Sequence, residues 1–246
     1  MPDANEPAAF TPQRVLCVCA HPDDPEFGFG GTVAKLAAEG AEVTYVICTD
    51  GAQGGEDPAV DDVELTETRY REQRAAAAVL GVRDVSFLGL RDGELVANLD
   101  LRRRIVREIR EHRPQLVLTQ SPVRALRSGR AGADHPDHLA VGEATLQAVY
   151  PDSRNPRAFR DLLVEGWQPH RVEEVWIGGA VETDHLVDVS GYVEAKLRAL
   201  ACHASQIDKP HRRHDDIERF VKAGLEERGR PAGYAYAEGF RRLDVR

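Results

Sequence analysis

The stretch RVLCVCAHPDDPEFGFGG, residues 14–31, contains the pattern on which the fold prediction rests. Residues 14–20 form a short apolar run with β-branched valines, which is typical of a buried strand. A polar loop is expected over residues 21–30, followed by a helix over residues 31–39 that ends at Gly40. A strand, a loop and a helix in this order form the first part of a β-α-β unit.

The same alternation continues through the first two thirds of the chain. Such alternation with short connections predicts an α/β fold, with a Rossmann-like parallel sheet flanked by helices on both faces. The further strands are expected over residues 42–49, 84–88 and 116–120, and the further helices over residues 66–80, 99–112 and 136–150.

Beyond Pro151 the pattern becomes less regular, with strands expected over 173–178 and 185–189 and helices over 192–204 and 215–227. No repeat and no linker divides the sequence. We therefore expect residues 14–246 to form a single domain with an irregular α/β C-terminal part. Residues 1–13 are polar and rich in proline, and they are expected to form a disordered arm.

Composition excludes several classes of protein. The net charge of −9 argues against a nucleic-acid partner, because phosphate binding requires concentrated lysine and arginine. No apolar run approaches the roughly 20 residues of a membrane span, and the N-terminus does not resemble a signal peptide. The four cysteines are interpreted as structural thiols. These features predict a cytoplasmic protein without a membrane partner.

The topology of such a sheet predicts where a ligand binds. With the strand order 3-2-1-4, the winding reverses between the first and fourth strands, and ligands bind at the carboxyl ends of strands at this point. The loops expected there span residues 21–30 and 121–138. Both contain a His-Pro-Asp sequence, at residues 21–23 and again at residues 135–137.

The paired His-Pro-Asp loops predict a metal site. Catalytic zinc takes three imidazole or carboxylate ligands and leaves a position for water, and His21, Asp24 and His138 would supply such a set. Asp23 lies between two ligands and is free to act as a general base. His135 could donate to a developing oxyanion, and Asp137 could orient and charge His135.

The sequence resembles the LmbE-like, or PIG-L, family of zinc-dependent N-deacetylases. The likeness extends over nearly the whole chain after residue 13, and the paired His-Pro-Asp loops are its most specific part. The matching motifs are residues 20–24 with Glu26, residues 30–31, Arg69-x-x-Glu72, residues 80–82, residues 92–93, residues 135–138, residues 196–206 and residues 236–240.

The resemblance implies a hydrolase that removes an acetyl group from an N-acetylglucosamine-type conjugate, with Zn²⁺ as cofactor and Fe²⁺ possible in cells. It assigns His21, Asp24 and His138 as metal ligands and Asp23 as the general base. By the same resemblance, His135 stabilises the tetrahedral intermediate and Asp137 pairs with it, while Arg69 and Asp92 contact the sugar. The partner is a small amino-sugar molecule, and the family also implies a homo-oligomer, either a trimer or a hexamer.

Several points stay open at the level of sequence. His203 and Gln206 fit either helix packing or support of the site. Arg124, Arg127 and Arg130 would make the mouth of the site basic.

Three other functions compete with sugar deacetylation. Dinucleotide binding fits the Gly28-x-Gly30 loop poorly, because Val33 replaces the third glycine and acidic residues would repel a pyrophosphate. A metal-binding or sugar-binding module without catalysis has no use for Asp23. An amidase acting on a larger thiol conjugate or antibiotic intermediate remains the main alternative.

Overall fold

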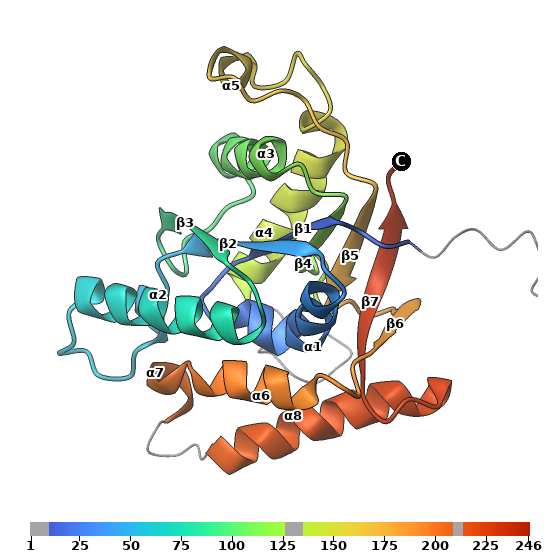
Figure 1. Ribbon diagram of the computed structural model, residues 1–246. Coiled ribbons are helices and arrows are strands. Elements are labelled where there is room, and N and C mark those ends of the chain that lie inside the picture. Colours follow the sequence, from blue (N-terminus) through green and yellow to red (C-terminus); the bar gives the residue numbers. More distant parts are fainter. Residues whose placement is uncertain (1–9, 126–134, 209–213) are drawn as a thin grey trace, which may run out of the picture.

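The computed structural model describes residues 10–125, 135–208 and 214–246, and its elements follow the expected β-α alternation (Figure 1). The strands are β1 (Arg14–Cys19), β2 (Glu42–Thr49), β3 (Asp84–Leu90), β4 (Leu116–Gln120), β5 (Glu174–Gly178), β6 (His185–Asp188) and β7 (Ala237–Asp244). The helices are α1 (Asp24–Ala38), α2 (Asp62–Val79), α3 (Leu99–His112), α4 (Pro136–Gln147), α5 (Arg160–Val164), α6 (Val193–Ala201), α7 (Ala204–Ile207) and α8 (His214–Gly229), with short turns η1 (Ala52–Gly54), η4 (Ala148–Asp152) and η5 (Arg230–Ala232).

The strands form one seven-stranded sheet in the order β3-β2-β1-β4-β5-β7-β6. Neighbours from β3 to β5 are parallel, whereas β7 runs antiparallel to both β5 and β6. The order of the first four strands is the predicted one, and the α/β fold class is confirmed. The winding therefore reverses between β1 and β4, whose carboxyl ends meet at one edge of the sheet.

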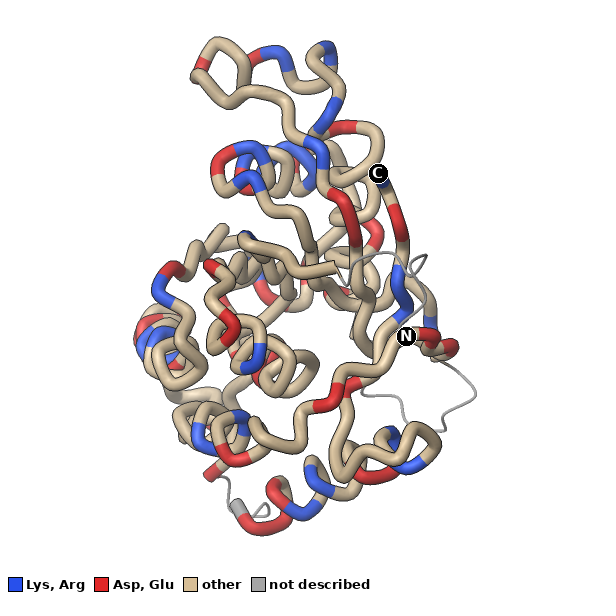
Figure 2. The backbone as a smooth tube through the Cα atoms, turned by 45° about the vertical axis from the view of Figure 1, so that its right-hand side comes forward, with Lys and Arg blue, Asp and Glu red and all other residues tan. Residues whose placement is uncertain are grey.

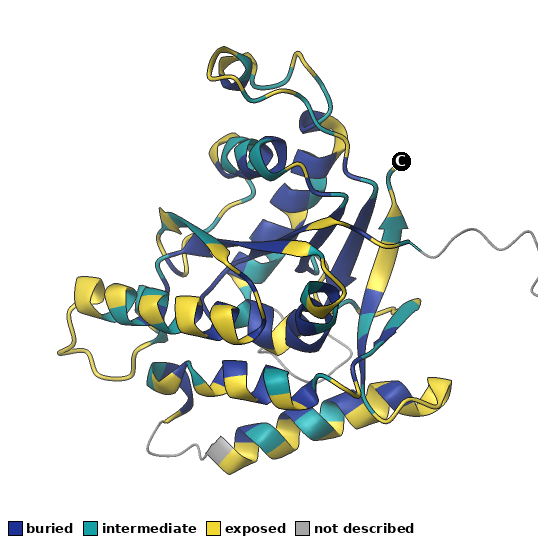
Figure 3. Ribbon diagram, in the orientation of Figure 1, coloured by how far each residue is buried: buried dark blue, intermediate teal, exposed yellow. Residues whose placement is uncertain are grey.

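Alternation along β1 builds a core on each face of the sheet. Val15, Cys17 and Cys19 belong to the core beneath α1, α2 and α6, whereas Leu16 and Val18 belong to the core beneath α3 and α4. All five side chains are buried because successive residues of a strand point to opposite faces. Figure 3 shows the central strands buried and the outer sides of the helices exposed.

Charged residues of both signs occur along the helices. Figure 2 marks Lys and Arg positions interspersed with Asp and Glu positions there, in the described parts of the chain. Within the same parts, no helix combines the length and the apolar character needed to cross a membrane.

The C-terminal third is built into the same sheet. In Figure 1, α6 and α8 lie beyond α1, and β7 returns between β5 and β6. The Glu238 carboxylate on β7 accepts hydrogen bonds from the backbone N–H groups of Gly31 (3.0 Å) and Thr32 (2.7 Å) in α1. The prediction did not include β7, whose partners are distant in the sequence.

The first helix begins earlier than the sequence pattern predicts. The expected loop over residues 21–30 is short, because α1 already begins at Asp24. Pro25 lies in the first turn, where proline is tolerated, and acidic side chains there interact favourably with the helix dipole. Gly31 is needed for packing, since a Cβ at this position would collide with Val189.

The predicted arm over residues 1–13 lies partly outside the described residues. Residues 10–13 are described, and they lie against the domain. The Phe10 ring packs edge-on to Trp176 with 6.5 Å between ring centroids, and the Gln13 carbonyl accepts a hydrogen bond from Glu42 (2.8 Å).

Candidate metal centre

Two turns bring the predicted site residues together at the reversal point of the sheet. His21 follows β1, Asp24 begins α1, and His138 lies in the first turn of α4. The N-terminus of α4 lies close to the end of β4 because residue 142 is glycine, and a Cβ there would collide with the Gln120 carbonyl oxygen. Residues 117 positions apart in the sequence thus meet at one point.

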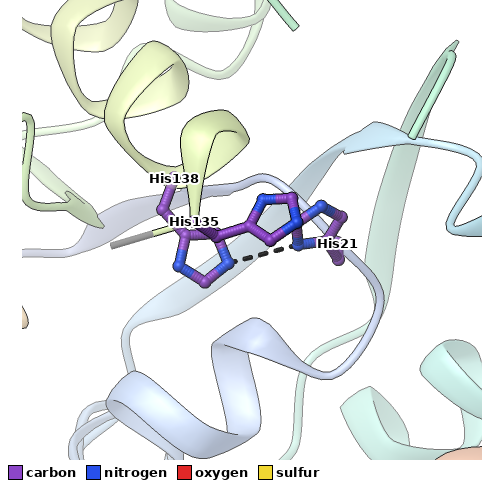
Figure 4. Close-up of side chains that lie close together, drawn as sticks. All are labelled: His21, His135 and His138. Atoms are coloured by element: carbon purple, nitrogen blue, oxygen red, sulfur yellow. Dashed lines mark hydrogen bonds between the residues drawn. The ribbon is translucent and has the colours of Figure 1, made fainter. Parts of the chain in front are cut away.

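His21, Asp24 and His138 form a compact group. His21 Nδ1 lies 3.2 Å from His138 Nε2, as drawn in Figure 4. The Asp24 carboxylate lies 3.2 Å from His21 Nδ1 through one oxygen and 3.1 Å from His138 Nε2 through the other. The structure therefore brings the three predicted ligands together, two from the turn after β1 and one from the first turn of α4.

These distances fit a metal ion. Ligands about 2.0–2.1 Å from a tetrahedral zinc ion lie about 3.3 Å from one another. The contacts here are close to this value at 3.1–3.2 Å, and each Asp24 oxygen approaches one imidazole. With one ligand atom from each residue, the set His21, His135 and His138 lies within 4.8 Å of one another, and so does the set His21, Asp92 and Asp137. The first of these sets shares both imidazoles with the predicted ligands and has His135 in place of Asp24.

Two further carboxylates hold the other nitrogen of His21. His21 Nε2 lies 3.1 Å from Asp92 Oδ1 and 3.2 Å from Asp137 Oδ2. The buried Asp137 carboxylate also accepts hydrogen bonds from the backbone N–H groups of Gly93 (2.7 Å) and Leu95 (3.1 Å). Carboxylates in this position orient a metal-binding imidazole and increase its basicity.

The carboxylates around His21 favour a positive charge at this position. Burial by itself would lower the pKa of His21, but the charge of Asp24 and hydrogen bonds to Asp137, Asp24 and Asp92 raise it to about 12. The surroundings therefore stabilise a cation at this point, and a divalent metal ion would also supply that charge.

Asp23 lies between His21 and Asp24 in the first turn and has an unusual backbone conformation, with φ of 97° and ψ of −26°. Its carboxylate lies 3.3 Å from the Arg69 guanidinium. Burial raises the pKa of Asp23 to about 6 although Arg69 opposes the shift. A carboxylate with such a pKa can both take up and release a proton near neutral pH.

His135 stands at the N-cap of α4 and faces His21, with 4.6 Å between the ring centroids. Its Nδ1 accepts a hydrogen bond from the backbone N–H of Asp137 (3.2 Å), so a neutral ring carries its proton on Nε2. Burial, followed by the charges of His21 and His138, lowers the pKa of His135. The Asp137 carboxylate was expected to pair with the His135 ring, but it lies against His21 instead.

Arg69 and Asp92 lie beneath this group and are 3% and 4% exposed. Arg69 donates to the carbonyl oxygens of Gly51 (2.7 Å) and Pro22 (2.5 Å). Asp92 accepts a hydrogen bond from the Gln53 backbone N–H (3.1 Å) besides contacting His21. Both residues predicted to contact the sugar therefore contact the turn of residues 21–24, Arg69 at Pro22 and Asp92 at His21.

Sequence reasoning missed a buried polar group beside Asp23. Glu26, Gln73 and His203 are all fully buried, and hydrogen bonds connect them. His203, which the sequence left open, thus lies among groups next to the site, whereas Gln206 donates to Ser205 Oγ (3.1 Å). The four-residue spacing of Arg69 and Gln73, which places them on one face of α2, was the available signal.

A cleft of about 570 Å³ opens beside the metal group. Asp24 and His138 line one end, and the Phe27 and Phe220 side chains line its walls towards α8. The volume lies within the range of small-molecule sites. Two of the three arginines predicted near the mouth, at positions 127 and 130, lie outside the described residues.

Fold and site define the class: an α/β protein with a His/Asp centre at the topological switch point of its sheet. The family model described as PIG-L, GlcNAc-PI de-N-acetylase, matches residues 16–149, more than half of the chain. The chain therefore belongs to the PIG-L family and is a hydrolytic N-deacetylase, as the resemblance predicted.

Relatives with known names support this assignment. The chain is 34% identical over 229 residues to diacetylchitobiose deacetylase from Thermococcus kodakarensis. This match covers 93% of this chain and 82% of the relative. It is 35% identical over 230 residues to 1D-myo-inositol 2-acetamido-2-deoxy-alpha-D-glucopyranoside deacetylase from Actinosynnema mirum, covering 80% and 81% of the two chains.

A solved structure is similar over nearly the whole chain. The N,N'-diacetylchitobiose deacetylase from Pyrococcus horikoshii superimposes with a TM-score of 0.87 at 31% identity. The match covers 95% of this chain and 85% of that chain.

Proposed function

We propose that this protein is a zinc-dependent N-deacetylase of N-acetylglucosamine-type conjugates, with His21, Asp24 and His138 as the metal ligands. The observation that carries the proposal is that His21 Nδ1, His138 Nε2 and the Asp24 carboxylate lie 3.1–3.2 Å from one another, with one Asp24 oxygen towards each imidazole. Asp24 is the third ligand in preference to His135, because it touches both imidazoles while His135 Nδ1 is engaged by Asp137. Iron(II) in cells suits the same donor set.

Asp23 acts as the general base in this proposal. A bound divalent ion supplies Lewis acidity and lowers the pKa of a water molecule to about 7. The Asp23 carboxylate accepts the proton of the attacking water and later delivers it to the leaving amine. The pKa of Asp23 near 6 supports both transfers.

His135 stabilises the oxyanion that forms when water adds to the amide carbonyl. The hydrogen bond from the Asp137 backbone keeps the proton of neutral His135 on Nε2, the nitrogen free to donate. Asp137 and Asp92 act through His21, whose ring orientation they fix.

The substrate is a small amino-sugar conjugate. Relatives named for diacetylchitobiose and for an acetamido-glucopyranoside of inositol support an N-acetylglucosamine group at the metal end of the cleft. Sugar contacts by Arg69 and Asp92 remain a prediction, and so do a trimer or hexamer in solution and a cytoplasmic location.

The cleft also favours a second candidate, an amidase for larger conjugates. Its volume of about 570 Å³ leaves room beyond one sugar ring, and Phe27 and Phe220 provide apolar walls. This function would use the same metal centre and the same base.

Acetate release from defined amides tests the proposal. The zinc-loaded protein should deacetylate N-acetylglucosamine or N,N'-diacetylchitobiose, whereas acetyl-lysine peptides should remain intact. Preferred cleavage of a bulky thiol conjugate over both sugars would favour the amidase. Turnover that survives complete chelation of the metal would contradict both functions.

A further inference from the structure

The backbone of Asp23 requires support from its surroundings. Its φ of 97° lies in a region that residues other than glycine rarely adopt. Asp23 is the N-cap residue of α1, but its side chain makes no capping hydrogen bond. The carboxylate is therefore available for chemistry, and other groups must stabilise the conformation that presents it.

Gln73 on α2 supplies such a group. The backbone N–H of Asp23 donates to Gln73 Oε1 at 2.8 Å, and the Gln73 side chain is fully buried. One helical turn earlier, Arg69 donates to the carbonyl oxygen of Pro22 and contacts the Asp23 carboxylate. Two side chains of one face of α2 thus hold the peptide before Asp23 and its carboxylate.

The orientation of the Gln73 amide is itself fixed. Its Nε2 donates to both carboxylate oxygens of Glu26, at 3.0 and 3.1 Å. A rotation of the amide by 180° would place an NH₂ group against the Asp23 N–H and an oxygen against the carboxylate. Glu26 is in turn held by His203 Nε2 at 3.1 Å.

We propose that Gln73 is a positioning residue for Asp23, and that Glu26 and His203 keep its amide in the required orientation. The proposal rests on the function proposed above, in which Asp23 is the general base. Gln73 acts on the rate of proton transfer through Asp23, and it leaves metal binding to the three ligands.

The variant Gln73→Met tests this role, because methionine fills a similar volume and offers only a weak acceptor. We expect kcat to fall by roughly 10–100-fold, the usual effect of losing an outer hydrogen-bond partner, with KM changed less than about two-fold and metal content unchanged.

Glu72→Gln serves as the matched control on the same helix. Glu72 accepts hydrogen bonds from the Ser205 backbone N–H (2.8 Å) and hydroxyl (2.6 Å), which connect α2 to α7. Its loss should lower Tm and leave kcat unchanged. Hydrogen exchange of the segment 21–27 provides a readout without turnover: it should accelerate in Gln73→Met and stay unchanged in Glu72→Gln.

A double-mutant cycle with Asp23→Asn decides the question. If Gln73 acts through Asp23, Gln73→Met should cost little further activity in the Asp23→Asn background. Equal losses in both backgrounds, or unchanged exchange of segment 21–27, would overturn the positioning role alone. Full activity of Asp23→Asn itself would instead overturn the proposed mechanism, and the positioning role would fall with it.

Discussion

Three sets of histidine and acidic side chains in the described structure have ligand atoms close enough to hold a metal ion, and they form two groups because two of the sets share His21. One surrounds His21 at the switch point of the sheet, and the other consists of Glu108, Glu111 and His112 on α3. Proximity alone does not distinguish them. They differ in where their residues come from and in what balances their charge.

The α3 group comes from a single helix and carries its own counter-charge. Arg107 lies 3.0 Å from the carboxylates of both Glu108 and Glu111. His112 approaches Glu108 at 3.5 Å, one turn along the helix. These contacts form an ordinary network of charged side chains on a helix.

The group around His21 has less direct compensation. The Arg69 guanidinium lies 3.3 Å from Asp23 and 3.9 Å from Asp92, and it also donates to two backbone carbonyl oxygens. Asp92 and Asp137 both lie against His21, and the ligand atoms converge from two elements. Among the described residues, the carboxylates around His21 share the single guanidinium of Arg69. This limited positive charge and the convergence of ligand atoms from separate elements together favour a metal centre at His21.

Removal of one histidine from each group should give the largest contrast. His138→Ala leaves two of three ligands, so metal content should fall from about one ion per chain to near zero, and activity with it. His112→Ala should keep both. Elemental analysis after dialysis measures the metal, and equal losses in the two variants would remove the distinction between the groups.

Asp23→Asn should separate metal binding from turnover. Asparagine cannot accept the proton, so kcat should fall by roughly two to four orders of magnitude, while the metal stays bound. Steady-state kinetics and metal content of the same preparation provide the measurement. A metal-free Asp23→Asn protein would mean that Asp23, and not Asp24, is the ligand.

Much of the fold and the candidate ligand set could be predicted because both depend on local pattern. Periodicity revealed the strands from β1 to β6, and the predicted order of the first four brought His21 and His138 together. The start of α1 was missed because glycines at positions 28, 30 and 31 argue against a helix. Close packing explains two of them, since a Cβ would crowd Lys196 at Gly30 and Val189 at Gly31. β7 was missed because its partners, β5 and β6, are distant in the sequence.

The contacts of Asp137 and Gln73, which surround the predicted ligands, could not be predicted from the sequence. Asp137 turns to His21 because the backbone N–H groups of Gly93 and Leu95 hold its carboxylate there. That arrangement depends on a turn after β3, more than forty residues away. Likewise, the contact of Gln73 with Asp23 requires the packing of α2 against the first turn.

Asp92→Asn should have a smaller effect than loss of a ligand. If Asp92 orients His21, the metal dissociation constant should rise by about 10–100-fold. Glu94→Gln is the matched control in the same turn, since Glu94 is exposed and pairs with Arg91. A raised KM for the sugar with unchanged metal affinity would favour the sugar contact predicted from family resemblance.

The smallest effect concerns the α3 group, where charge should affect stability alone. The hydrogen bond to Glu108 raises the pKa of His112 although burial opposes the shift, so their interaction stabilises the fold while His112 is protonated. This contribution is complete below the unfolded-state pKa of about 6.5, provided that Glu108 is ionised, and it is lost as pH rises through the folded-state pKa. His112→Ala should therefore lower the free energy of unfolding by about 1 kcal/mol or less near pH 6, and by less at pH 9. Urea unfolding at both pH values measures the difference. An effect that grows with pH would contradict this interpretation. So would a stabilisation of the wild-type protein by added zinc that is lost in His112→Ala, because the α3 group would then bind a metal ion.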